Sequence, residues 1–587
     1  MARIDPHSYT DPAQGVVETL RWRFDVDFHK KRLIGEATLI FAEARAGDLD
    51  LDTRDLIISA VTGDKGSDLP FTLAESEGFM GAKLRIERPS EVKELTICYE
   101  TTPNASALQW LAPANTAGAK HPFLFSQCQP IHARSMVPIQ DSPKVRFGYE
   151  AEVTVPASLA AVMSAAPSEA RVEDDKKIYS FSMPQPIPAY LLALAVGDIT
   201  FRDLGPRTRV YAEPATLEAA AWEFSDVERM LEAAEGLFGP YLWDRFDFIV
   251  MPPAFPYGGM ENPRLTFLTP TLIAGDRSLV NVLAHELAHS WTGNLVTNAT
   301  MNDFWLNEGF TVWAERRILE RLEGEAAVSL AAAIGRHALQ ADMERFGADS
   351  PFTQLETDLA GHDPDDVYSV VPYEKGFLFV VQLERDLGRE AFDVWVRRYL
   401  EHFAFTSITT QEFEDFMEET QPGLLERVGG KAWIHGSGLP EDAPVFASEE
   451  LAAIEAQADA WEAGGRPGIE VAKSWSAEKW QIFLQRLPRP LSRDDCAWLD
   501  GNFSLTVSNN SEVLSQWLNI VAASSYGPAL PRLREFLSQV GRMKFLKPLY
   551  GALWNNQETK AMAREIFDAS REAYHPIAQG VVNGMLS

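Results

Sequence analysis

The chain has 587 residues, of which 46% are hydrophobic and 23% charged, and this composition excludes a disordered, collagen-like or disulfide-stabilised protein. Its 53 Lys and Arg against 84 Asp and Glu give a net charge of −31, which disfavours binding to nucleic acid or to an anionic membrane. At roughly 100–200 residues per domain, the length predicts about three to five domains.

The cysteines and the N-terminus indicate a reducing compartment. Cys98, Cys128 and Cys496 are far apart and form no metal-spaced pair. The first 15 residues contain no apolar segment of the kind found in secretory signals. No run approaches the roughly 18 apolar residues that a membrane-spanning helix needs. We therefore expect a soluble, cytoplasmic protein with no nucleic-acid or membrane partner.

The first third of the chain has the pattern of β-strands. Apolar residues alternate with charged ones over 20–28 and again over 145–155, which is typical of half-buried strands. Turn-forming residues such as those of 63–66 separate these runs. We predict an N-terminal antiparallel β-sheet domain over 1–203.

From about residue 215 the apolar residues follow a helical period. Helices are predicted over 276–292, 303–322 and 374–386, within a second domain over 204–440. A loop rich in Gly and Pro, 436–444, then interrupts the pattern.

The last part, 447–587, is helical in character. For example, an apolar stripe from Val513 to Val521 follows a helix cap at Asn510 or Ser511. We predict a separate C-terminal α-helical domain.

The sharpest local motif is His285-Glu286-Leu287-Ala288-His289, in a helix that we expect to begin at Asp276 or Ser278 and to end at Gly293. Residues four apart lie on one face of a helix, so both imidazoles can bind one zinc ion. Glu286 lies about 100° round the helix, where a base can take a proton from metal-bound water. The alternative is a buried helix whose histidines bond to carbonyl groups.

A hydrolytic zinc site has three protein ligands and one open position. Glu308 can supply the third ligand near the start of the next helix, capped by Asn302 or Asp303. We predict one Zn²⁺ per chain, held by His285, His289 and Glu308.

With these ligands in place, the chain resembles the gluzincin aminopeptidases of peptidase family M1, and within them the leukotriene A(4) hydrolase group. The similar blocks are the zinc motif with Glu308 eighteen residues after His289, the segment Gly258-Gly259-Met260-Glu261-Asn262, the segment 371–376 around Tyr373, the segment 125–129 and the segment 541–545. The resemblance implies a multidomain α+β fold: the N-terminal β domain, a thermolysin-like, mostly helical zinc catalytic domain, and a C-terminal superhelical domain of the armadillo or HEAT type.

The resemblance also implies roles for the residues. Glu286 would activate the zinc-bound water for attack on the peptide carbonyl, and Tyr373 would stabilise the resulting oxyanion. Glu261 would bind the free N-terminus of the substrate. The remaining residues of that substrate contact would be Gln129, Gly258, Gly259 and Met260.

Four further residues would set specificity. In the resembled hydrolase, the counterparts of Arg542 and Lys544 bind the carboxylate of short peptides, so tripeptides should fit best. Asp365 and Tyr368 match positions at the side-chain pocket, where an acidic residue would favour an N-terminal Arg or Lys. Glu315 either orients a zinc histidine or has no part in the site.

The sequence therefore predicts a zinc aminopeptidase, a monomer, that removes basic or small N-terminal residues from short peptides. One alternative is an epoxide hydrolase of the leukotriene A(4) hydrolase type. Met301 replaces a tryptophan of that enzyme and Phe310 replaces a histidine, and we expect both to alter the shape of the pocket. Another alternative is a zinc-bearing binding protein without catalysis.

Overall fold

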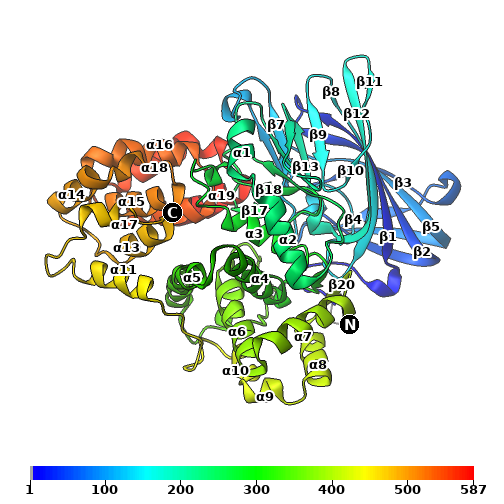
Figure 1. Cartoon of the computed structure of the whole chain (residues 1–587). Coiled ribbons are helices and arrows are strands. Elements are labelled where there is room, and N and C mark those ends of the chain that lie inside the picture. Colours follow the sequence, from blue (N-terminus) through cyan, green and yellow to red (C-terminus); the bar gives the residue numbers. More distant parts are fainter. Residues whose placement is uncertain (1–3) are drawn as a thin grey trace.

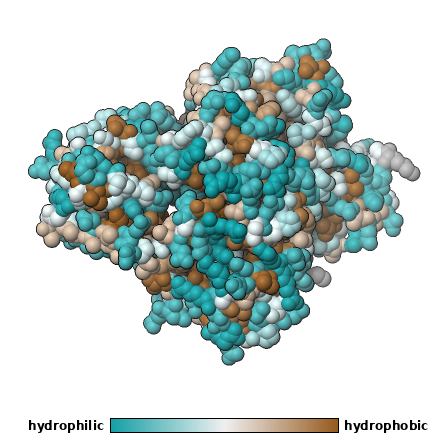
Figure 2. Space-filling view, in the orientation of Figure 1, coloured by the Kyte–Doolittle hydropathy of each residue, from teal (hydrophilic) through white to brown (hydrophobic). Residues whose placement is uncertain are grey.

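The computed structural model describes residues 4–587, with the exception of the Lys65 side chain. Three parts follow one another along the chain: a β-rich part, a central mixed part and a C-terminal part made of helices (Figure 1). This arrangement confirms the predicted three-part fold class. The surface seen in Figure 2 is largely hydrophilic, with small scattered groups of hydrophobic residues.

The β-rich part contains a nine-stranded sheet with the path β10-β12-β8-β1-β2-β5-β3, to which β11 and β4 are added at β12 and β5. Its strands are β1 (Val17–Asp27), β2 (Arg32–Thr53), β3 (Ile57–Thr62), β4 (Phe71–Leu73), β5 (Ala82–Glu100), β8 (Arg146–Pro156), β10 (Ala166–Pro167), β11 (Arg171–Glu173) and β12 (Lys176–Pro188). The runs predicted over 20–28 and 145–155 are the strands β1 and β8. These two strands pair parallel to each other, whereas the other neighbours in this sheet are antiparallel.

Three smaller sheets complete the β-structure of the β-rich and central parts. They are β6 (Leu108–Leu111), β7 (Phe123–Ser126), β13 (Leu194–Gly197) and β9 (Ala160–Met163); then β14 (Thr200–Asp203), β15 (Thr208–Ala212), β16 (Phe246–Val250), β18 (Thr266–Leu268) and β17 (Gly259–Met260); and β19 (Val296–Asn298) with β20 (Thr406–Ile408). β14 precedes the domain limit predicted at residue 203 and pairs with β15, which follows it. The limits of the domains stay predictions.

The central part carries ten helices among the described residues. They are α1 (Leu217–Glu223), α2 (Val227–Phe238), α3 (Asn281–Ala288), α4 (Trp305–Glu323), α5 (Glu325–Phe346), α6 (Gly376–Leu387), α7 (Arg389–His402), α8 (Thr410–Thr420), α9 (Leu424–Arg427) and α10 (Gly430–Ile434). Buried side chains of the β-rich and central parts form one continuous hydrophobic core.

The C-terminal helices enclose a second core. They are α11 (Glu449–Asp459), α12 (Ile469–Ala472), α13 (Ala477–Arg486), α14 (Arg493–Phe503), α15 (Ser511–Ala523), α16 (Leu530–Gln539), α17 (Met543–Asn555), α18 (Lys560–Ser570) and α19 (Pro576–Met585). Asn510 is the cap of α15, because its side chain accepts hydrogen bonds from the backbone N–H groups of Glu512 and Val513. In the part of the chain that the structure describes, no helix combines the length and apolarity needed to cross a membrane.

The helices that carry the zinc motif are shorter than predicted. α3 begins at Asn281 rather than at Asp276 or Ser278, because Arg277 adopts a positive φ and Asp276 accepts hydrogen bonds from Ser278 in a turn. α3 ends at Ala288, but His289 keeps helical backbone angles, so the spacing of the two histidines survives.

The helices predicted over 303–322 and 374–386, which are α4 and α6, also begin later than predicted. α4 begins at Trp305, because Thr300 caps a short 3-10 turn over Met301–Asp303 and the Asp303 carboxylate accepts from the Thr410 N–H instead of capping α4. α6 begins at Gly376, because the preceding Val371–Lys375 form a π-helical turn.

Candidate zinc site and substrate pocket

A single cavity of about 310 Å³ brings together most of the residues predicted from the sequence. The predicted residues that line it are Gln129, Gly258, Gly259, Glu261, His285, Glu286, His289, Glu308, Asp365, Tyr368, Tyr373, Arg542 and Lys544. Met260 is the exception, because its side chain is buried and its sulfur contacts the Gln127 amide at 3.3 Å. Residues from all three parts of the chain therefore meet at one place.

The three predicted zinc ligands converge from α3 and α4. Nε2 of His285 and Nε2 of His289 each lie 3.4 Å from the Oε2 atom of Glu308. Glu308 Oε2 is buried and accepts no hydrogen bond from the described residues. Two imidazole nitrogens and an unsatisfied carboxylate oxygen that face one another are a suitable donor set for a zinc ion.

Both histidines are oriented by their second ring nitrogen. His285 Nδ1 lies 3.0 Å from Glu315, and His289 Nδ1 lies 2.9 Å from the Thr292 carbonyl oxygen. Since a carboxylate or a carbonyl oxygen only accepts, each Nδ1 carries the hydrogen and each Nε2 presents its lone pair to the site. Of the two readings left open for Glu315, the structure supports the one in which it orients a zinc histidine.

Glu286 lies against the glycine segment. A Cβ atom on Gly259 would lie 2.3 Å from the Glu286 carboxylate, so only glycine allows this approach. Burial raises the pKa of Glu286 to about 8, and this effect outweighs the nearby His285 and His289, which lower it. A cation at the ligands would favour the ionised form of this carboxyl.

Glu261 is buried beside the ligands. Gln129 Nε2 donates to Glu261 Oε1 over 3.3 Å, and the Asn294 amide donates to the Glu261 backbone carbonyl over 2.7 Å. Burial raises the pKa of this carboxyl as well. The Glu261 carboxylate is thus held in place, with Gln129 next to it in the cavity wall.

Tyr373 projects from the π-helical turn toward His285, with 6.2 Å between the two ring centroids. Its hydroxyl accepts a hydrogen bond of 3.2 Å from the Tyr368 hydroxyl. The flanking residues anchor the turn: the Glu374 carboxylate pairs with Arg316 at 2.8 Å, and Lys375 Nζ donates to two backbone carbonyls at 2.8 Å each. Burial raises the pKa of Tyr373, which keeps its hydroxyl protonated and able to donate.

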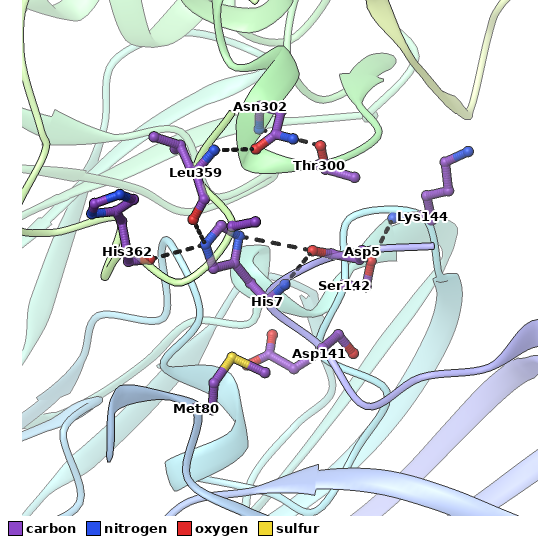
Figure 3. A network of polar contacts seen from close by, with 12 residues as sticks. Asp5, His7, Met80, Asp141, Ser142, Lys144, Thr300, Asn302, Leu359 and His362 are labelled. Carbon is purple, nitrogen blue, oxygen red and sulfur yellow. Dashed lines mark hydrogen bonds and ion pairs between the residues drawn. The ribbon is translucent and has the colours of Figure 1, made fainter. Parts of the chain in front are cut away.

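The loop that carries Asp365 also forms part of the cavity wall. His132 Nε2 lies 2.8 Å from the Asp365 carboxylate. The start of the loop is held from two sides, as Figure 3 shows: His7 Nε2 donates to the carbonyls of Leu359 and His362, and the Asn302 side chain accepts from the Leu359 N–H. The β-rich part thus positions a wall of the pocket.

The cations predicted to bind a carboxylate stand at the start of α17. Arg542 Nη1 lies 3.1 Å and Lys544 Nζ 2.9 Å from the carboxylate of Glu512, a residue of α15. Nothing in the sequence indicates Glu512 or His132, because their partners are distant along the chain. The only local feature of Glu512 is its place in the first turn of a helix, where acidic residues are common anyway.

The two residues that depart from the resembled enzyme have different places. Met301 lines the cavity, as expected. Phe310 does not: its ring is fully buried, 5.5 Å from Tyr399 and 5.9 Å from Phe413, measured between ring centroids. The expectation that Phe310 shapes the pocket is wrong, because the side of α4 on which it lies faces the hydrophobic core.

Comparison with known proteins gives consistent matches along the chain. Residues 6–191 match the peptidase M1 N-terminal domain, 222–431 the peptidase family M1 domain, and 475–586 the leukotriene A4 hydrolase C-terminal family. The chain is 38% identical over 599 residues to leukotriene A-4 hydrolase of Xenopus laevis, covering 98% of each chain. It is 37% identical to leucine aminopeptidase 2 of Ajellomyces capsulatus, covering 95% of this chain and 93% of the relative.

Solved structures agree. The yeast LTA4 hydrolase in complex with bestatin superposes with a TM-score of 0.92 at 33% identity, covering 100% of this chain and 97% of the yeast chain.

Proposed function

This chain belongs to peptidase family M1 and is a zinc-dependent hydrolase of the metallopeptidase class, and we propose that it removes N-terminal residues, basic or small, from short peptides such as tripeptides. The observation that carries the proposal is the single cavity in which the zinc ligands, the buried Glu261 and the cations Arg542 and Lys544 all lie. Such a cavity offers a contact for each end of a short peptide.

His285, His289 and Glu308 would hold the zinc ion. When bound there, zinc supplies a Lewis acid that polarises the scissile carbonyl and lowers the pKa of water. The chain contributes the orientation of these ligands: Glu315 and Thr292 fix the two imidazoles, and Oε2 of the buried Glu308 accepts no hydrogen bond from the residues that the structure describes.

Glu286 is the proposed general base. It takes a proton from the attacking water and then delivers it to the amine that leaves. Its carboxylate lies against Gly259, so that it would be close to a substrate backbone bound along the glycine segment. Such proton transfer typically contributes about 10²–10⁴ in rate.

Tyr373 is the proposed donor to the oxyanion. Its ring lies against that of His285 in the same cavity. The Tyr368 hydroxyl donates to the Tyr373 hydroxyl, so that the hydrogen of Tyr373 remains available for the developing negative charge. The anchored π-helical turn holds this hydroxyl in place before the substrate binds.

Glu261 is the proposed contact for the substrate ammonium group. Its buried carboxylate, with Gln129 beside it, can bind a cation close to the zinc ligands and so restrict cleavage to the first peptide bond. Arg542 and Lys544 would bind the carboxylate at the other end, which limits the length of the peptide. Asp365 and Tyr368 would line the pocket for the first side chain, and Asp365 favours Arg or Lys there.

The test compares Arg-Gly-Gly and Ala-Gly-Gly with their N-acetyl forms, with and without a zinc chelator. We expect cleavage of the free peptides only, abolished by the chelator and restored by zinc. Asp365→Asn should reduce the preference for arginine over alanine. Equal cleavage of acetylated and free peptides would contradict the role of Glu261, and an equal loss for both free peptides would contradict that of Asp365.

A second candidate activity is hydrolysis of a lipid epoxide, since the relatives include a leukotriene A-4 hydrolase. The favouring observation is a small apolar cavity that shares four lining residues with the main one: Met301, Phe304, Pro364 and Tyr368. Its volume of about 50 Å³ is small for a fatty chain, so we expect peptide hydrolysis to dominate. Product analysis after incubation with leukotriene A4 tests this; formation of the diol would support the second activity.

A further inference from the structure

The two cations at the start of α17 contact a carboxylate that the proposed function does not use. Glu512 lies within 3.1 Å of Arg542 and within 2.9 Å of Lys544. Resting on the proposed function, in which these cations bind the substrate carboxylate, we propose that Glu512 is a specificity-determining residue: it competes with that carboxylate and limits the site to one weakly held negative charge.

The backbone fixes Glu512 in this position. It is the second residue of α15, and its N–H donates to the side chain of the cap residue Asn510 over 3.1 Å. Asn510 also donates to Ser278 in the central part of the chain. The Glu512 carboxylate is therefore attached to the contact between the C-terminal helices and the central part, and it does not depend on a mobile loop.

The side chains of Glu512, Arg542 and Lys544 differ in how far they are exposed. Glu512 and Arg542 are each 6% exposed, whereas Lys544 is 53% exposed. Arg542 and Lys544 line the cavity and Glu512 does not. A ligand in the cavity thus meets the cations first, and Glu512 acts on it through them.

Arg542 can hold both carboxylates at once. Its Nη1 atom contacts Glu512 and the Thr271 hydroxyl, while its Nη2 atom lies beside Gly258, where a Cβ atom would be only 2.7 Å away. The guanidinium fork therefore keeps one edge for a ligand in the cavity. Glu512 weakens the binding of a substrate carboxylate without blocking it.

The local charges explain why a competitor is needed. Two cations stand at the N-terminus of α17, where the helix dipole is positive too. Burial raises the pKa of Glu512, but Lys544 and Arg542 outweigh burial and hold it below its usual value, so that Glu512 is ionised. The cluster then carries a net charge of +1, which matches a single carboxylate.

This balance also bears on product release. The dipeptide that remains after cleavage keeps the carboxylate of the substrate, so a contact made equally by substrate and product slows release without speeding the reaction. A cluster of charge +1 holds both more weakly than a cluster of +2 would.

The test is a charge series: wild type (+1), Glu512→Gln (+2), Lys544→Gln (0) and the double variant (+1). For each, the KM of one tripeptide is compared with the KM of its C-terminal amide, and product inhibition by the dipeptide acid is measured. We expect Glu512→Gln to increase the preference for the acid over the amide by about tenfold and to strengthen product inhibition, and Lys544→Gln to reduce both. The double variant should return toward wild type, and high salt should reduce every difference.

Each outcome of this test either supports or overturns the proposed role of Glu512. An unchanged or smaller preference in Glu512→Gln would overturn the competition, because Glu512 would then only position the cations. If wild type does not distinguish acid from amide, the carboxylate contact of the proposed function fails and this inference fails with it. If Glu512→Gln does not fold, the double variant compared with Lys544→Gln measures the same effect, and it must show the stronger preference for the acid.

Discussion

The zinc ligands and the carboxylate-binding cations lie in one cavity but are built differently. His285, His289 and Glu308 come from two helices within the core shared by the β-rich and central parts, and each histidine has a fixed second partner. Arg542 and Lys544 come from the second core and reach the cavity only where the two cores meet. The positions of the metal ligands depend on local helix geometry. The positions of Arg542 and Lys544 depend on how the C-terminal helices pack against the central part.

The docking contact is close and involves backbone. The N–H groups of Gly541 and Met543 donate to the carbonyls of Pro253 and Pro256, at 2.7 and 2.8 Å. These carbonyls belong to the segment that leads into Gly258 and Glu261. The C-terminal helices therefore support the same segment that contacts the zinc-binding helix.

The largest expected effect concerns the chemistry at the metal. Glu286→Gln removes the base while keeping the shape of the side chain, so we expect kcat to fall by about 10³ with little change in the KM of the tripeptide. Zinc content and melting temperature should stay near wild type. A loss confined to KM would mean that Glu286 binds substrate rather than moving a proton.

A smaller effect is expected from the partner of a zinc histidine. Glu315→Gln should weaken zinc affinity by about 10–100-fold, measured by competition with a chelator, because His285 loses the charge that orients and polarises it. The matched control is Glu325→Gln, at an exposed residue in the first turn of α5, which should leave zinc affinity unchanged.

A substitution at the contact between Gly541 and the segment 253–256 tests whether the zinc ligands and the cations are positioned independently. A Cβ atom on Gly541 would lie 2.8 Å from the backbone of Ala254, whereas one on Gly527 would meet nothing within 4 Å. We expect Gly541→Ala to lower kcat/KM for tripeptides by about tenfold and to leave the zinc content intact. Gly527→Ala should change neither. Loss of zinc from Gly541→Ala would show that the two sites are not separately built.

The last expected effect is on the pH dependence of stability and not on catalysis. Burial lowers the pKa of Lys375, two residues after Tyr373, from 10.5 to about 7. Between these values the unfolded chain binds more protons than the folded one, so this residue makes stability rise with pH from about 7 to 10.5. Lys375→Met should flatten that rise by up to about 1.4 kcal/mol per pH unit in urea unfolding. Lys431→Met, at an exposed lysine, is the control.

The difference between residues placed by helix geometry and residues placed by tertiary packing also explains how much of this site the sequence predicts. The zinc ligands could be predicted because the spacing of His285 and His289 has the same meaning in any helix, even though α3 proved shorter than expected. Gly258, Glu261 and Tyr373 could be placed only through the resemblance to a family. Glu512 and His132 could not be predicted, because each acts on a residue brought close by tertiary packing.

The core shared by the β-rich and central parts has a consequence for dissecting the enzyme. Strand β14 pairs with β15, His7 bonds to the loop at Leu359, and hydrophobic side chains are continuous from Val17 to Ala443. A recombinant fragment that contains only the central part would expose a large hydrophobic surface and unpaired strand edges. We therefore expect it to aggregate. We expect that a fragment able to fold must include at least the residues of this core, from Val17 to Ala443.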